Sequence, residues 1–273
     1  MNFREKLDLV VTRNNSLVCV GLDSEIAKMP PHIQSMEDPQ FEFNKSIIDA
    51  TADLVCAYKP NIAFYELFGA RGITSLLKTI EYIPKNIPIV LDAKRGDIGD
   101  TSYMYAKSYF ETFGVDAVTI HGYMGSDTVA PFMKYEDKAI FVLVKTSNPS
   151  AVEFEDMELK DGKKLYIKVA EKIAEWNELY PGLCGTVVGA TFPADLKPIR
   201  VILPDVPFLV PGLGKQGGDT EQTVLNGMDA RGRGLLINSA RAIIFAGNGL
   251  DFAQKAREET LKLRDKINQY RKG

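Results

Sequence analysis

The sequence is poor in cysteine and histidine, with three cysteines (Cys19, Cys56 and Cys184) and two histidines (His32 and His121) among 273 residues. The cysteines lie in apolar, strand-like runs, and their odd number and their spacing match neither a disulfide framework nor a metal motif. We therefore expect buried free thiols in a reducing compartment, which predicts a cytoplasmic protein without a metal site.

Long apolar runs and an excess of positive charge are missing as well. No apolar run approaches the roughly 18 residues needed to cross a bilayer, and the charged amphipathic start of the chain lacks the apolar core of a signal peptide. The formal net charge of -3 provides no broad basic surface for nucleic acid or an anionic membrane. We expect neither of these partners, and any phosphate binding must be local.

The sequence does contain short, nearly continuous apolar runs, which are typical of strands buried on both faces. Eight of them recur along the chain: Leu17–Leu22, Leu54–Tyr58, Ile87–Leu91, Val115–Ile120, Ala139–Val144, Gly185–Ala190, Val206–Val210 and Leu235–Ile237. Segments with helical periodicity lie between them, for example Phe41–Ala52, Gly72–Tyr82, Thr101–Phe113, Lys163–Leu179, Thr220–Ala230 and Phe252–Tyr270.

Strands that alternate with helices indicate parallel βαβ units. Eight such units predict an α/β protein with a single-domain (β/α)8 TIM barrel over residues 1–273, a length typical of that fold. A doubly wound open sheet is the alternative.

In such a barrel the catalytic groups follow the carboxyl ends of the strands. Asp92 and Lys94 end the third strand, and both should face the barrel mouth because alternate strand residues point to the same side. Lys59, from the neighbouring strand, can reach them. Buried charges are costly unless they are paired, so this array predicts coupled titration and a fixed carboxylate beside an ammonium that can deliver a proton. The alternative is a structural ion-pair network at the rim.

A glycine-rich turn follows the seventh strand, with glycines at 212, 214, 217 and 218, and Arg241 follows the eighth strand. The loops after these two strands commonly form the phosphate site of TIM barrels, so we expect a phosphate there. The alternative is a turn whose glycines serve geometry only.

The segment 148–164 is longer and more acidic than a usual barrel loop. It is consistent with either a cover over the active site or a plain surface insertion.

Residues 91–101, LDAKRGDIGDT, resemble the orotidine 5′-phosphate decarboxylase family, which carries an Asp-x-Lys-x-x-Asp-Ile signature at the end of its third strand. The similarity extends in order to GLD at strand one, Lys59 at strand two, SNPSA at strand five, PGLGKQGGD at strand seven and Arg241 at strand eight. The ordered set is specific, and it is similar to the longer bacterial branch, whose motif reads DAKRGDI.

The resemblance implies decarboxylation of orotidine 5′-monophosphate (OMP) to UMP and CO2 in pyrimidine biosynthesis, without metal or organic cofactor, by a homodimer with shared active sites. It implies that Asp92 lies against the substrate carboxylate and that Lys94 protonates C6 as CO2 leaves.

The same resemblance implies the roles of the remaining site residues. Ribose hydroxyls would be held by Asp23 and Lys59, the pyrimidine edge by Ser147, and the phosphate by Gly212, Gly214, Gln216 and Arg241. The partner subunit's site would be reached by Asp97, Ile98 and Thr101.

Three rival functions stay open. Mg-dependent keto-sugar phosphate decarboxylases and synthases look similar around the signature, although the SNPSA and PGLGKQGGD segments favour the nucleotide enzyme. A class I aldolase would use Lys94 or Lys145 as a Schiff-base amine. A non-catalytic phosphate-binding barrel would have no need of the charged Lys59–Asp92–Lys94 array.

Overall fold

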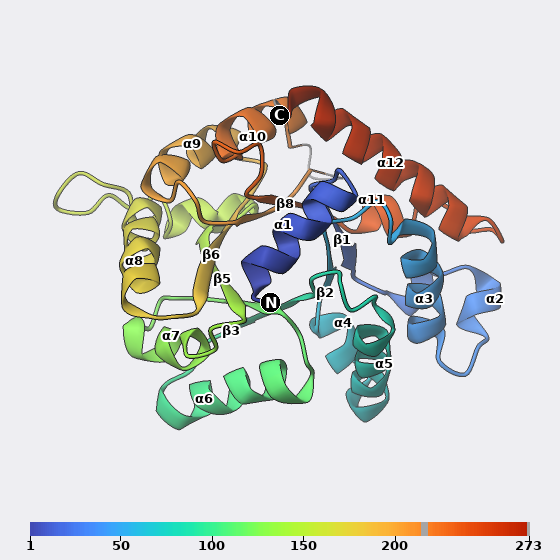
Figure 1. Ribbon diagram of the computed structural model, residues 1–273. Coiled ribbons are helices and arrows are strands. Elements are labelled where there is room, and N and C mark those ends of the chain that lie inside the picture. The colour runs from blue at the N-terminus through green and yellow to red at the C-terminus, as the bar shows by residue number, and fades with distance from the viewer. Residues whose placement is uncertain (214–217, 272–273) are drawn as a thin grey trace.

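The computed structural model describes residues 1–213 and 218–271, and it is built around eight parallel strands (Figure 1). In chain order these are β1 (Val18–Leu22), β2 (Ala57–Pro60), β3 (Val90–Arg95), β4 (Ala117–Ile120), β5 (Ala139–Lys145), β6 (Leu183–Val188), β7 (Phe208–Pro211) and β8 (Leu235–Ser239). The strands neighbour one another in the order β2-β1-β8-β7-β6-β5-β4-β3.

The two outer strands of this order, β2 and β3, are joined by parallel bridges between Tyr58 and Ile89 and between Asn61 and Asp92. The sheet therefore closes on itself. The prediction of a single (β/α)8 barrel is confirmed, and the open sheet is excluded.

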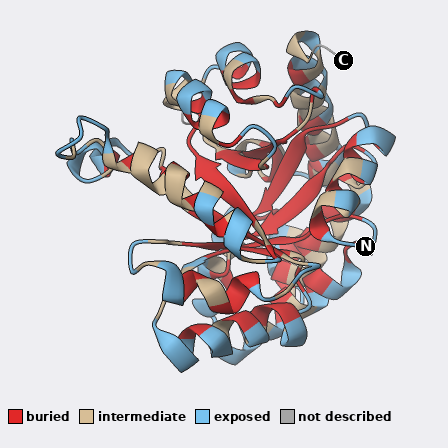
Figure 2. Cartoon of the chain, turned by 60° about the vertical axis from the view of Figure 1, so that its left-hand side comes forward, coloured by how far each residue is buried: buried red, intermediate tan, exposed pale blue. Residues whose placement is uncertain are grey.

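Helices surround the barrel, and buried residues concentrate on the strands and on the inner faces of the helices (Figure 2). The helices are α1 (Phe3–Arg13), α2 (Pro31–Gln34), α3 (Pro39–Thr51), α4 (Ala63–Glu66), α5 (Gly69–Tyr82), α6 (Gly99–Lys107), α7 (Ser126–Met133), α8 (Leu165–Leu179), α9 (Pro193–Ile202), α10 (Thr220–Gly227), α11 (Arg241–Ile244) and α12 (Phe252–Tyr270). Short 3-10 turns, η1 (Ile26–Lys28) and η3 (Pro149–Glu153), and a π-helical turn, η2 (Ser108–Thr112), complete the elements.

The three cysteines are free and buried, as expected. None of the helices in the described part of the chain combines the length and the apolarity of a membrane-spanning segment.

Most predicted elements differ from the observed ones by a few residues, and the differences in two strands and one helix bear on the site. β2 and β3 begin three residues later than the predicted apolar runs and continue through the charged residues that follow those runs, so Lys59, Asp92 and Lys94 lie inside strands. A prediction from hydrophobicity alone ends a strand at the first charged residue. In the structure, pairing with the neighbouring strands extends both strands through their charged residues. The helix predicted over 101–113 is divided at residue 108 into α6 and the π-helical turn η2.

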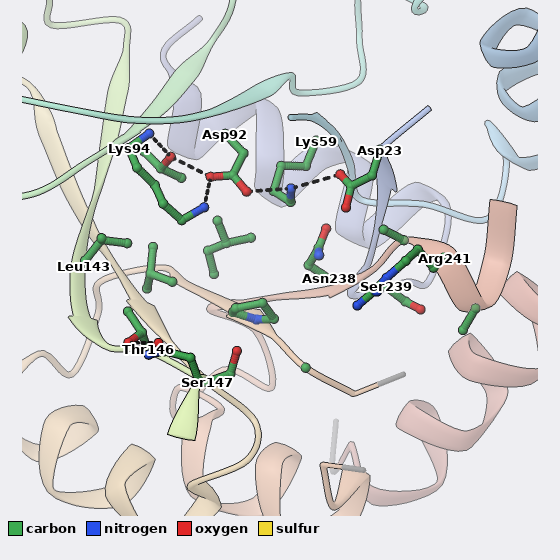
Figure 3. Close-up of a pocket in the computed structure, with 18 of the residues that line it drawn as sticks. Asp23, Lys59, Asp92, Lys94, Leu143, Thr146, Ser147, Asn238, Ser239 and Arg241 are labelled. Carbon is green, nitrogen blue, oxygen red and sulfur yellow. Dashed lines mark hydrogen bonds and ion pairs between the residues drawn. The ribbon is translucent and has the colours of Figure 1, made fainter. Parts of the chain in front are cut away.

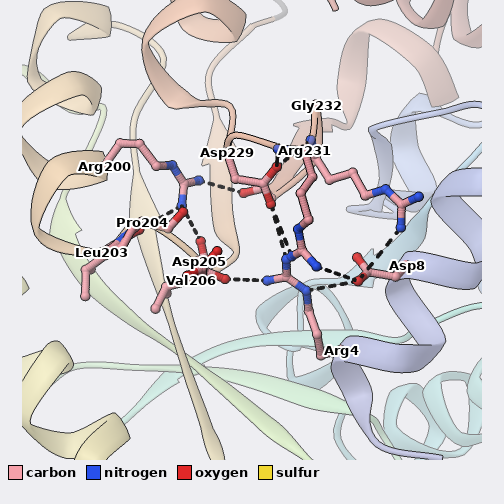
Figure 4. A network of polar contacts seen from close by, with 12 residues as sticks. Arg4, Asp8, Arg200, Leu203, Pro204, Asp205, Val206, Asp229, Arg231 and Gly232 are labelled. Carbon is pink, nitrogen blue, oxygen red and sulfur yellow. Dashed lines mark hydrogen bonds and ion pairs between the residues drawn. The ribbon is translucent and has the colours of Figure 1, made fainter. Parts of the chain in front are cut away.

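Helix α1 covers the amino-terminal end of the barrel. The Phe3 ring packs edge-on against Phe141 of β5, with centroids 5.7 Å apart. Arg4 donates to the Asp229 carboxylate and to the Asp205 carbonyl, in the loops that precede β8 and β7 (Figure 4). With this end covered, the carboxyl ends of the strands form the open mouth.

Candidate active site

A cavity of about 530 Å³ opens at the carboxyl ends of the strands. Figure 3 shows a row of charged side chains along one wall, Thr146 and Ser147 on the opposite wall, and Arg241 beside Asn238 and Ser239 at one end. The described residues that line it are Asp23, Lys59, Asp92, Lys94, Thr119, Leu143, Thr146, Ser147, Asn148, Glu155, Val187, Leu209, Pro211, Gly212, Asn238, Ser239, Ala240, Arg241 and Ala242.

The charged row contains the predicted Lys59–Asp92–Lys94 array. Lys59 Nζ lies 2.9 Å from one Asp92 oxygen, and Lys94 Nζ lies 2.6 Å from the other. Lys59 also lies 3.8 Å from Asp23, which extends the row toward β1. The Lys59 and Asp92 side chains are 4% and 11% exposed, but that of Lys94 is 50% exposed. Lys94 is therefore the ammonium that a bound molecule can reach.

The charges of this row stabilise one another. Burial by itself raises the pKa of Asp92, but Lys59 and Lys94 outweigh that effect and hold the pKa well below its usual range. Burial lowers the pKa of Lys59, whereas Asp92 and Asp23 raise it, and the net pKa is above the usual lysine value. Asp92 is thus a carboxylate and Lys59 an ammonium throughout the neutral range.

The backbone of β3 departs from a regular strand at this site. Lys94 has a φ of +48°, which residues with a side chain rarely adopt. The register between β3 and β4 shifts between Leu91 and Arg95. The prediction that Asp92 and Lys94 come together is confirmed, but they meet through this irregular backbone rather than through simple alternation.

The wall at the end of β5 is held by the segment that follows it. Glu155 accepts hydrogen bonds from the Thr146 amide (2.9 Å) and hydroxyl (2.7 Å). Lys145, whose side chain is fully buried, lies 2.7 Å from Asp156 and 3.9 Å from Glu155. Ser147 follows Thr146 in the chain and lines the cavity.

The end of the cavity near β7 and β8 has the features expected for an anion. Gly212, with a φ of +108°, and Arg241 both line it. Asn238 lies beside them, and its buried side-chain oxygen, which has no hydrogen-bond partner within the described residues, is an acceptor for a ligand hydroxyl or N–H group rather than for the anion. The predicted phosphate residues Gly214 and Gln216 lie outside the described residues.

Three predicted site residues do not line this cavity in the described part of the chain: Asp97, Ile98 and Thr101. They follow β3 and begin α6, and Ile98 is 63% exposed. The structure therefore brings Asp23, Lys59, Asp92, Lys94, Ser147, Gly212 and Arg241 together in one chain but separates Asp97, Ile98 and Thr101 from them.

Sequence reasoning did not select several residues that the structure places in the wall, namely Thr119, Thr146, Glu155 and Asn238. Asn238 and Thr146 are polar residues at strand ends, which is a usable signal. Thr119 stands in an apolar run and Glu155 in a long loop, and nothing local in the sequence marks either of them.

This arrangement can move a proton beside a fixed negative charge. A ligand with an anion at Arg241 and a reacting atom near Lys94 would place that atom next to the Asp92 carboxylate. No group of three or more His, Cys, Asp or Glu side chains is gathered as metal ligands in the described part of the chain.

Comparisons with known proteins agree with this geometry. The family model of the orotidine 5′-phosphate decarboxylase / HUMPS family matches residues 16–256. An orotidine 5′-phosphate decarboxylase of Thermomicrobium roseum is 46% identical over 100% of this chain and 97% of its own length, and one of Dechloromonas aromatica is 48% identical over 99% and 100%. The structure of Leishmania donovani OMP decarboxylase superposes with a TM-score of 0.86 at 39% identity, covering 99% of both chains. This chain belongs to the orotidine 5′-phosphate decarboxylase / HUMPS family.

Proposed function

We propose that this protein is a carboxy-lyase that converts OMP to UMP and CO2, the last step of UMP formation. The observation that carries the proposal is the contact between the half-exposed Lys94 ammonium and the buried Asp92 carboxylate, in a cavity with Arg241 at its other end. Relatives that are 44 to 48% identical over most of their length carry the name of this enzyme.

The substrate fits the cavity in one orientation. Its phosphate lies at Gly212 and Arg241, its ribose hydroxyls at Asp23 and Lys59, and its pyrimidine edge at Ser147. The C6 carboxylate then lies against Asp92, and C6 lies near Lys94.

The chemical step needs only the residues of the chain. The bond between C6 and the carboxyl carbon breaks, CO2 leaves, and the electron pair stays on C6. The Lys94 ammonium stabilises this developing charge and transfers its proton to C6, and Lys94 regains a proton from solvent. A positioned cation where charge develops is among the strongest contributions that a protein can make.

The groups at the two ends of the substrate have different roles in catalysis. Repulsion between Asp92 and the substrate carboxylate favours departure of CO2. Contacts to the distant phosphate supply binding energy that holds the reacting group in place, so they contribute to transition-state binding as well as to affinity.

A Mg-dependent keto-sugar phosphate reaction fits the site less well. Both oxygens of Asp92 already accept hydrogen bonds from lysine ammonium groups, which would repel a divalent cation. We propose that the reaction uses neither metal nor organic cofactor.

We further propose a cytoplasmic homodimer with shared active sites. Asp97, Ile98 and Thr101 lie next to exposed apolar side chains of α6, of which Met104 is 61% exposed and Tyr103 is 41% exposed. A second copy that covers this surface would bury these side chains. Asp97, Ile98 and Thr101 of one copy would then lie at the mouth of the other copy's cavity.

The experiment that tests the function follows the loss of OMP absorbance with purified protein in EDTA. We expect full turnover, with UMP and CO2 as products in equal amounts. Loss of activity in EDTA that Mg²⁺ restores would favour the metal-dependent alternative, and borohydride trapping of a substrate adduct would favour the aldolase. Binding of UMP without turnover of OMP would favour the non-catalytic phosphate-binding barrel.

A further inference from the structure

Thr119 of β4 has a buried hydroxyl whose hydrogen-bonding capacity is completely used by the catalytic segment of β3. Thr119 as a whole residue is 1% exposed. Its Oγ1 donates to Asp92 (2.9 Å) and accepts from the backbone amides of Ala93 and Lys94 (3.0 Å each). A hydroxyl has one proton to donate and two lone pairs, so these three bonds saturate it.

The two amide bonds lie where the regular ladder between β3 and β4 is interrupted. Val118 pairs with Leu91, and the next pair is Ile120 with Arg95. Between these pairs β3 has the three residues 92–94, whereas β4 has only Thr119. The Thr119 side chain therefore supplies the acceptor that a regular neighbouring strand would provide through its backbone, and it holds the bulge that contains Lys94.

The third bond fixes the Asp92 carboxylate. One oxygen accepts from Lys94 and from Thr119, and the other accepts from Lys59. Lys94 is half exposed and has a long side chain, so it cannot fix the carboxylate plane by itself. Thr119 and Lys59 are the buried partners that do so from two sides.

We propose that Thr119 is a positioning residue for the decarboxylation: it holds the bulge of β3 so that Lys94 and Asp92 face the same reacting carbon. This inference rests on the proposed function for its catalytic readout. Thr119 acts through Asp92 and Lys94, so its loss should affect the chemical step more than the binding of the nucleotide.

The test compares Thr119→Val, which keeps the shape and removes the hydroxyl, with Thr119→Ser, which keeps the hydroxyl. Thr186→Val is the matched control, because Thr186 is a buried threonine of β6 whose hydroxyl has no partner within the described residues. The measurements are kcat and KM for OMP, the dissociation constant of UMP, and amide hydrogen exchange at residues 93 and 94. Thermal midpoints establish that each variant is folded.

For Thr119→Val we expect kcat to fall about 100-fold, as a displacement of about 1 Å can cause, with KM and UMP affinity within about threefold of wild type. Amide exchange at residues 93 and 94 should accelerate, because both amides lose their acceptor. Thr119→Ser and Thr186→Val should stay within about threefold of wild type in every measurement.

The proposal is overturned if Thr119→Val keeps its kcat, if it loses UMP affinity as much as kcat, or if Thr119→Ser is as impaired as the valine variant. If Thr119→Val does not fold, Thr119→Cys takes its place with the same expected outcomes, because a thiol is a weak donor and acceptor. Wild-type protein that does not decarboxylate OMP would refute the proposed function instead, and the exchange measurement would still test the bulge.

Discussion

Lys94 combines a strained backbone with an exposed ammonium. A positive φ at a residue with a side chain costs on the order of 1–3 kcal/mol and persists only where the surroundings enforce it. Here the Asp92 carboxylate and the Thr119 hydroxyl enforce it, through a 2.6 Å ion pair and a bond to the Lys94 amide. The strain places an ammonium at the cavity while its carboxylate partner stays buried.

The division of roles between Lys94 and Arg241 gives the first prediction. Lys94→Ala should lower kcat by at least about a thousandfold, because it removes the cation where charge develops, and should leave UMP binding largely intact. Arg241→Ala should raise KM about ten- to hundredfold, the usual worth of a hydrogen bond to a charged group. Steady-state kinetics with OMP measures both, and the reverse pattern would show that the roles are assigned wrongly.

The lowered pKa of Asp92 predicts how stability depends on pH. Because the pKa in the folded state lies below the unfolded value of about 3.9, the ionised group stabilises the fold above that value. The contribution is lost as the pH falls through the folded-state pKa.

We therefore expect Asp92→Asn to be less stable than wild type by on the order of 2 kcal/mol above about pH 5, and this difference should shrink below about pH 4. Urea unfolding at several pH values provides the measurement. A difference that stays constant down to pH 3 would argue against the ionised pair.

At the scale of elements, the segment 148–164 is joined to the barrel through a buried lysine. Lys145 Nζ lies 2.7 Å from Asp156 and 4.7 Å from the centre of the Phe192 ring. Glu155, next to Asp156, holds Thr146 and lines the cavity. Asn148 and Glu155 of this segment are thus part of the cavity wall, whereas Phe154 (64% exposed) and Met157 (53% exposed) are exposed.

This anchoring predicts that Lys145→Met raises KM for OMP about five- to tenfold. That change corresponds to the free energy of roughly one hydrogen bond, which we expect the displaced wall to lose at the pyrimidine edge. Amide exchange over residues 149–164 should accelerate as well. Lys164→Met is the matched control, because Lys164 also pairs with Asp156 but its side chain is 51% exposed, and exposed pairs contribute little. Equal effects of the two substitutions would mean that the buried lysine does not anchor the segment.

At the scale of the whole molecule, the barrel builds a cavity with most of the expected groups but leaves part of the family signature outside it. Asp97 is only three residues beyond Lys94, yet it follows the end of β3 and is absent from the described cavity wall. The shared site of the proposed two-fold dimer would account for this placement, because each chain would then complete its partner's cavity.

The proposed shared site predicts that inactive subunits complement one another. Lys94→Ala and Asp97→Ala proteins should each be nearly inactive, and unfolding and refolding them together should restore activity. Random pairing makes about half of the dimers mixed, and one site in each mixed dimer has both residues intact, so roughly a quarter of all sites should recover. Specific activity of the mixture is compared with the mean of the parents, and no gain after proven subunit exchange would show that Asp97 serves its own chain.

The sequence by itself determined the eight strands and the group of polar residues at the strand ends, and it favoured the closed barrel over the open sheet. These features depend on local apolar runs and on the rule that parallel strands bring their carboxyl ends together. Asp92, Lys94, Lys59 and Arg241 follow from that rule, whereas Ser147 was implied by the family resemblance, and all five residues line one cavity.

The tertiary structure alone decided how those residues are held. The bulge at Lys94 depends on the register of β3 against β4. The Thr119 hydroxyl accepts a hydrogen bond from the Lys94 amide, 25 residues away in the chain. Glu155, in a long loop, accepts a hydrogen bond from the Thr146 amide. Hydrophobic periodicity carries no information about such contacts, because they arise only when segments that are distant in the chain pack at a particular register. The same reason explains why Thr119 looks in the sequence like any other residue of a buried strand.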